Sequence, residues 1–125
     1  MGTVHRAQIF FDAGSGGVLW MSGQAAWGAW GHPVDLGRLP ISEALRRELA
    51  DLAARYDTSV NWDYPPDPGP WREDECARFN QEVQQAVSRL RGELGPDWQI
   101  TDRVEELQED PDLDRYLADP AAFRR

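Results

Sequence analysis

The sequence has no lysine, one cysteine and two histidines, and each shortage excludes a class of site. A lone Cys76 cannot build a disulfide framework, and one cysteine with two histidines is too few for a Cys- or His-rich metal site. A P-loop is excluded because its phosphate-binding motif ends in lysine followed by serine or threonine. We therefore expect no metal and no cofactor.

Long apolar runs are also absent. No run approaches the ~20 residues that a membrane-spanning helix needs. The first residues show no charged segment followed by a long apolar one, so we expect no secretory signal. An unpaired cysteine is typical of a reducing compartment. These features predict a cytoplasmic protein that does not bind membranes.

Acidic residues outnumber basic ones in this sequence. The 125 residues include 22 acidic and 13 basic ones, all of the latter arginine, and the net charge is −9. Direct binding to nucleic acid needs clustered basic residues that displace counterions from phosphates, so this balance argues against it. An acidic surface keeps a protein soluble and steers a basic partner towards it. We therefore predict a basic protein partner.

The spacing of apolar residues predicts an α+β fold. Ala7–Phe11 and Gly17–Met21 are typical of strands and flank a turn of small residues, which predicts an antiparallel hairpin. Apolar residues recur every three or four positions from Ile41 to Tyr56 and over Arg72–Leu94, which predicts two amphipathic helices. A third, short strand is expected within Trp98–Val104.

The order β-β-α-α-β favours a two-layer sandwich, in which the two helices cover one face of a small antiparallel sheet. Residues 1–104 are expected to form this single domain, and residues 105–125 an acidic C-terminal tail. The tail either forms one short helix around Leu113–Ala118 or stays loose. Ser42 is the expected N-cap of the first long helix, and Arg46 is expected on its solvent side.

Two local patterns resemble nucleophile sites. Ser15 lies among glycines, as in a nucleophile elbow, but that turn needs a helix after the serine and the following residues predict a strand. Cys76 falls near the start of the second helix, where a helix N-terminus lowers a thiol pKa, while the preceding Glu73, Asp74 and Glu75 raise it. We favour a hairpin turn, a buried inert thiol and a protein that is not an enzyme.

The acidic tail contains the beginning of a calcium-binding pattern. Asp110, Asp112 and Asp114 match the first three ligand positions of a calcium-binding helix–loop–helix. The match then fails, because Arg115 stands where glycine is required and Ala121 where a bidentate glutamate is required. A solvated acidic tail is therefore favoured over a cation site.

Trp27 and Trp30 lie in the stretch Ser22–Pro40, whose glycines and prolines permit little regular structure. If exposed, the pair forms an apolar patch for a protein or ligand partner. If buried, it pins a long loop onto the helices, which is the interpretation we favour. The candidate partner-binding residues join this loop to the acids of the C-terminal part: Trp27, Trp30, Asp102, Glu105, Glu106, Glu109, Asp110, Asp112 and Asp114.

Several segments between residues 36 and 104 carry a family resemblance. They are Leu39–Ser42, Ala54–Thr58, Trp62–Asp63, Pro70–Trp71, Phe79 and Leu90–Gly95. In these segments the chain resembles a group of small acidic actinobacterial proteins of unassigned function. The matching positions are mostly helix faces and the connector between the helices, so the resemblance implies a fold and no catalytic or binding residue.

The leading hypothesis is a non-catalytic binding protein that masks a basic partner, such as an immunity protein or antitoxin against a nuclease-type toxin. It rests on the net charge, the acidic tail and the lack of a catalytic constellation. Two alternatives remain open. One is an accessory or structural subunit with an interface on the Ser22–Pro40 loop, which we call the Trp loop. The other is a small enzyme that uses carboxylates or His32 in a pocket beside that loop.

Overall fold

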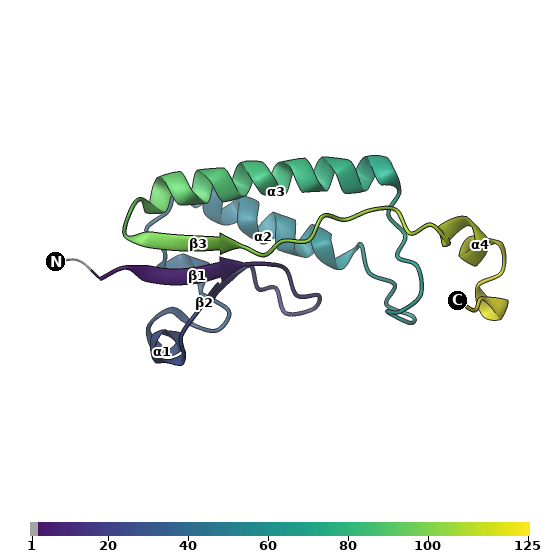
Figure 1. The fold of residues 1–125 in the computed structure, drawn as a ribbon, viewed down its shortest axis with the longest axis horizontal. Helices are drawn as coiled ribbons and strands as arrows, with labels where there is room; N and C mark the ends of the chain where they lie inside the picture. The colour runs from purple at the N-terminus through teal and green to yellow at the C-terminus, as the bar shows by residue number, and fades with distance from the viewer. Residues whose placement is uncertain (1–2) are drawn as a thin grey trace.

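The protein, described here by a computed structural model over residues 3–125, has an α+β fold built on one three-stranded sheet (Figure 1). The strands are β1 (His5–Ile9), β2 (Leu19–Met21) and β3 (Trp98–Asp102), arranged in the order β2-β1-β3. The predicted α+β class and the chain order β-β-α-α-β are confirmed.

Two long helices cover one face of the sheet (Figure 1). They are α2 (Glu43–Asp57) and α3 (Glu73–Leu94), each within two residues of its predicted bounds. Ser42 is the N-cap of α2, as predicted. Gly95 directly follows the last residue of α3, and its φ of 76° lies in the left-handed region that glycine adopts without strain.

The sheet is mixed, so the prediction of an antiparallel sheet is wrong for the third strand. The hairpin pairing of β1 with β2 is antiparallel, as expected, but β1 pairs with β3 in parallel, from His5 opposite Trp98 to Ile9 opposite Asp102. The reason is topological. Because α2 and α3 run in opposite directions, the chain leaves α3 at the end of the sheet where β1 begins, and β3 then runs alongside β1 (Figure 1).

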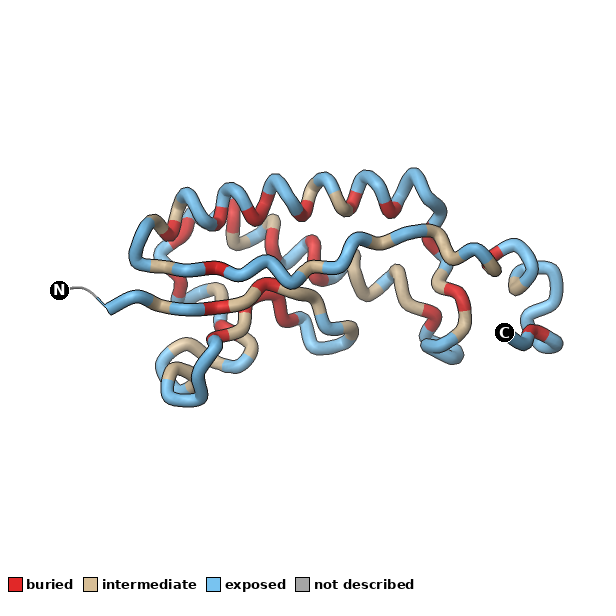
Figure 2. The backbone as a smooth tube through the Cα atoms, in the orientation of Figure 1, coloured by how far each residue is buried: buried red, intermediate tan, exposed pale blue. Residues whose placement is uncertain are grey.

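The core lies between the sheet and the two helices (Figure 2). One face of α3 is buried along its length, and α2 and the strands supply the opposing apolar side chains. Cys76 lies in this core and is 2% exposed. Burial raises the pKa of its thiol, and the charges of Glu73, Glu75 and Glu109 raise it further. The prediction that this thiol is buried is confirmed, and its inertness stays a prediction.

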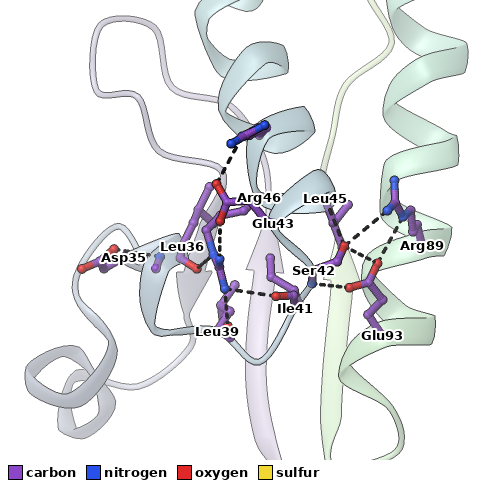
Figure 3. A network of polar contacts seen from close by, with 12 residues as sticks. Asp35, Leu36, Leu39, Ile41, Ser42, Glu43, Leu45, Arg46, Arg89 and Glu93 are labelled. Carbon is purple, nitrogen blue, oxygen red and sulfur yellow. Dashed lines mark hydrogen bonds and ion pairs between the residues drawn. The ribbon is translucent and has the colours of Figure 1, made fainter.

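A polar network ties the start of α2 to the end of α3 (Figure 3). The Ser42 hydroxyl accepts a hydrogen bond from the Leu45 N–H at 3.1 Å and donates one to Glu93 at 3.0 Å. The Ser42 N–H also donates to Glu93, at 2.6 Å, and Arg89 donates to the same carboxylate at 3.1 Å. The Ser42 N–H is the main cause that lowers the pKa of Glu93, with Arg89 adding to it.

The C-terminal residues run beside α3 and continue into a short helix, α4 (Leu113–Ala118), and a 3-10 turn, Pro120–Ala122 (Figure 1). Asn80 holds this segment to α3, because its amide donates to the Leu107 carbonyl at 2.8 Å and accepts from the Leu107 N–H at 2.9 Å. Leu113 and Phe123 are buried. The acidic segment is therefore held to α3 at Asn80, and two of its apolar side chains are buried further along.

Replacing Ser42 by alanine removes the side-chain N-cap of α2 and the hydroxyl contacts to Glu93 and Arg89, while the backbone N–H contact to Glu93 remains. We expect Ser42→Ala to lower the free energy of unfolding by about 1–2 kcal/mol, because the Leu45 N–H loses its acceptor. Urea unfolding followed by tryptophan fluorescence measures the change. The matched control is Ser88→Ala at an exposed position of α3, expected to change stability by less than about 0.5 kcal/mol. Equal losses in the two variants would contradict the capping role.

Candidate partner-binding surface

The two tryptophans of the Ser22–Pro40 loop are half-buried and hold this loop against the sheet. The Trp27 indole donates to the Met21 carbonyl at 3.3 Å and stacks on His32, with 3.8 Å between ring centroids. Trp30 meets Trp98 edge to face at 5.0 Å. The favoured interpretation placed the loop against the helices, but the two indoles contact the strands and the loop itself. Part of each ring stays accessible to a partner.

The Trp loop contains more regular structure than its glycines and prolines suggest. Gln24–Ala26 and Leu36–Arg38 form 3-10 turns, and Trp27–Trp30 form one helical turn, α1. The end of the loop is fastened by Arg46, which donates to the carbonyls of Leu36, Leu39 and Ile41 at 3.0 to 3.1 Å (Figure 3).

Arg46 is thus half-buried instead of solvent-facing, and the prediction for it is wrong. Its guanidinium supplies donors to carbonyls that the irregular backbone leaves unpaired. Nothing in the residue spacing separates Arg46 from its exposed neighbour Arg47, so sequence reasoning missed this role.

The aspartates of the calcium-like pattern are paired with arginines. Asp110 and Asp112 accept from Arg125 at 2.6 and 3.1 Å, and Asp114 accepts from Arg72 at 2.8 Å. The Arg125 guanidinium is the main cause that lowers the pKa of Asp110. Guanidinium groups therefore occupy the positions in which the sequence pattern would place a cation.

Two further predicted acids also make contacts within the protein. Glu109 and Glu73 exchange hydrogen bonds between backbone N–H and carboxylate at 3.0 and 3.2 Å, and Asp102 accepts from the Gln84 amide at 3.1 Å. Within residues 3–125, the carboxylates of Glu105 and Glu106 form no ion pair. The structure does not bring all the predicted acids together into one free face.

A cluster of charges that sequence reasoning missed faces Tyr56. This half-buried ring lines a surface hollow of about 400 Å³ together with Phe10, Phe11 and Glu105. Burial raises the pKa of Tyr56, and the charges of Glu105, Asp12 and Asp57 raise it further, in that order. These acids come from the hairpin turn, the end of α2 and the segment after β3, so no spacing in the sequence could have grouped them.

One family model matches most of this structure. It describes proteins like the Serratia CdiI immunity protein and matches residues 11–102, about three quarters of the chain. The chain belongs to this family. As a CdiI-like protein it is an immunity-type protein, which confirms that part of the leading hypothesis. The matched range contains β2, α2, α3 and β3, whereas α4 lies outside it.

No curated protein sequence matches this CdiI-like chain. Within residues 3–125, none of its helices combines the length and apolar composition that crossing a membrane requires.

The pairing of Asp110 with Arg125 predicts an acid-sensitive C-terminus. Because the pKa of Asp110 is lowered in the folded protein, its stabilising contribution is present above the ordinary carboxylate pKa and is lost as the pH falls through the lowered value. We expect Arg125→Gln to loosen the packing of the C-terminal segment at neutral pH, as acidification does in the wild type. NMR signals of the buried Leu113 and Phe123 side chains report this loosening. Signals identical to those of the wild type at neutral pH would contradict this role of Arg125.

Neutralising two of the acids around Tyr56 tests their placement. In the double variant Asp12→Asn and Glu105→Gln, we expect the pKa of Tyr56 to fall towards its ordinary value, because less repulsion opposes the phenolate. NMR titration of the Tyr56 ring measures this pKa. An unchanged value would show that these charges do not face the ring.

The raised pKa of Tyr56 also predicts how the stability of the protein changes in alkaline solution. The contribution of the protonated Tyr56 to stability is complete below the unfolded-state pKa and is lost as the pH rises through the folded-state pKa. Tyr56→Phe should therefore lose less stability than the wild type on going from neutral to alkaline solution.

Proposed function

We propose that this CdiI-like protein protects a cell against the toxin of a contact-dependent inhibition system by binding that toxin directly. The observation that carries the proposal is the family match over residues 11–102. On this proposal the protein masks the toxin and performs no chemistry on it.

The groups that resembled catalytic ones support a binding role. The Ser15 hydroxyl donates to the Asp12 carbonyl at 2.7 Å and accepts from the Gly17 N–H at 3.0 Å, so it stabilises the hairpin turn. His32 stacks on Trp27, and Cys76 is buried with a raised thiol pKa. Each of these side chains therefore has a structural role.

The distribution of charge supports a basic toxin surface as the target. The net charge is −9, and several carboxylates form no ion pair within residues 3–125, among them Asp12, Asp63, Glu105 and Glu106. A toxin that grips phosphates has a positive cleft, and opposite charges accelerate association in a salt-dependent way. A nuclease-type toxin has this chemistry, and an acidic protein bound over its cleft excludes the substrate.

Binding and protection are tested with toxin domains of contact-dependent inhibition systems, each produced together with this protein. Co-expression should restore growth to cells that produce the toxin, and the purified proteins should form a stable complex. We expect the association rate constant to fall by about tenfold or more between low and high salt, because the attraction is screened.

Two outcomes separate the parts of the proposal. If the toxin stays active at saturating concentrations of this protein, the immunity function towards it is refuted. If the complex forms and protects but its association rate does not depend on salt, the basic character of the partner surface is refuted while the immunity function stands.

A further inference from the structure

Large exposed apolar side chains gather at one end of the molecule. Within residues 3–125, four such side chains stand out: Val4 is 44% exposed, Trp62 57%, Tyr64 56% and Leu117 53%. Trp62 and Tyr64 belong to the proline-rich connector between α2 and α3, and Leu117 belongs to α4. The connector and α4 lie together beyond the ends of β1 and β3, at the opposite end of the molecule from the start of β1 (Figure 1). Val4 directly precedes β1.

The connector and α4 enclose an apolar groove of about 310 Å³. Trp62, Pro68 and Pro70 line it from the connector, and Tyr116 and Leu117 line it from α4. We call this site the Trp62 groove. Its size suits one large apolar side chain of a partner, and a concave apolar surface is where binding energy concentrates in protein interfaces.

The groove is held in place before any partner arrives. Asn61, at 9% exposure, donates to the Pro68 carbonyl at 3.1 Å and accepts from the N–H groups of Asp63 and Tyr64 at 3.0 and 3.2 Å. The prolines restrict the backbone further. A preorganised site loses little conformational entropy on binding, so it binds more tightly than a mobile loop of the same composition.

Trp62 itself is oriented although it is exposed. Its indole N–H donates to the Asp57 carbonyl at 2.7 Å, and a Cβ placed on Gly14 would lie 3.4 Å from the ring. The ring therefore rests against the hairpin turn and the end of α2, while its free face remains in solvent. A fixed aromatic ring of this kind is typical of the residues that dominate binding energy in interfaces.

The charges beside Trp62 indicate what kind of partner fits. Asp63 follows it directly, and Asp57 and Asp12 lie on the side of the hairpin turn; none of the three forms an ion pair within residues 3–125. The Asp57 carboxylate accepts a hydrogen bond from the Gly14 N–H at 3.0 Å. On the far side of the connector, Arg125 is already paired with the carboxylates of the tail.

We propose that the toxin docks at the Trp62 groove, with an aromatic or aliphatic side chain between Trp62 and Leu117 and neighbouring lysines or arginines against Asp63 and Asp12. This inference rests on the proposed immunity function and names its contact surface. One wall of the groove comes from the family-matched residues and the other, α4, from outside them. The Trp loop, which the sequence made the main aromatic candidate, is not the principal contact on this proposal.

The test compares matched single variants in binding to the toxin domain that the wild type binds. Leu117→Arg places a positive charge in the groove, and Val4→Arg makes the same change in charge at an exposed apolar position at the opposite end. We expect Leu117→Arg to weaken binding by at least about tenfold, as loss of an interface anchor does. We expect Val4→Arg to leave the Kd within about twofold of the wild type, which is the size of effect seen outside hot spots.

A second pair tests the charge and does not disturb α4. Asp63→Asn should weaken binding, and Asp97→Asn, which removes an exposed charge at the opposite end, should not. Isothermal titration calorimetry gives each Kd, and thermal unfolding shows whether each variant keeps the fold. If Leu117→Arg is unfolded, the comparison of Asp63→Asn with Asp97→Asn decides the question.

Failure of the groove is distinguishable from failure of the immunity function. A wild type that does not bind the toxin refutes the proposed function. A wild type that binds, with groove variants that bind as well as their controls, refutes the groove alone. Sedimentation of the protein without toxin tests for a second copy in the groove: a dimer that Leu117→Arg dissociates would overturn the assignment to the toxin, and a monomer supports it.

Discussion

One buried ring, Phe79 on α3, joins the segments on which the rest of the structure depends. It is 1% exposed, and its centroid lies 5.5 Å from that of Phe11, 6.3 Å from Tyr56 and 5.2 Å from Trp71. These rings come from the hairpin, the end of α2 and the start of α3, so their burial fixes where three segments meet. The connector that carries Trp62 is therefore anchored at both ends, which gives an exposed aromatic side chain a rigid support.

Arginine pairing determines which part of the negative charge a partner can reach. The tail supplies the densest acidic sequence, but Arg72 engages Glu109 and Asp114 and fastens the tail to the start of α3. Arg125 pairs with Asp110 and Asp112 within the tail and donates to the Pro66 carbonyl of the connector. The acids near Tyr56 and Trp62 come from segments that are distant in sequence. On the proposed function, these acids would attract a basic toxin surface beside a preorganised apolar groove, so that steering and anchoring would act on the same face of the protein.

Local patterns predicted the elements of this fold, and long-range pairing decided the rest. The apolar period of α2 and α3 and the cap at Ser42 depend on neighbours within a few residues, so they could be predicted from the sequence. The parallel direction of β3 depends on the path of both helices, and the pairing of Arg125 with Asp110 depends on how the terminus folds back. The Trp62 groove needs α4 beside the connector, which no spacing indicates. The resemblance to small acidic actinobacterial proteins stays a prediction.

The central claim is that this CdiI-like protein meets its toxin at the connector and α4. Hydrogen–deuterium exchange of the protein, alone and saturated with the toxin domain that it binds, tests it most directly. The account predicts slower exchange in the complex for the amides of α4 and of residues Asn61–Asp67 in the connector, with exchange in the Trp loop unchanged. Protection confined to the Trp loop or to the strands, with the connector and α4 exchanging as in the free protein, would contradict it.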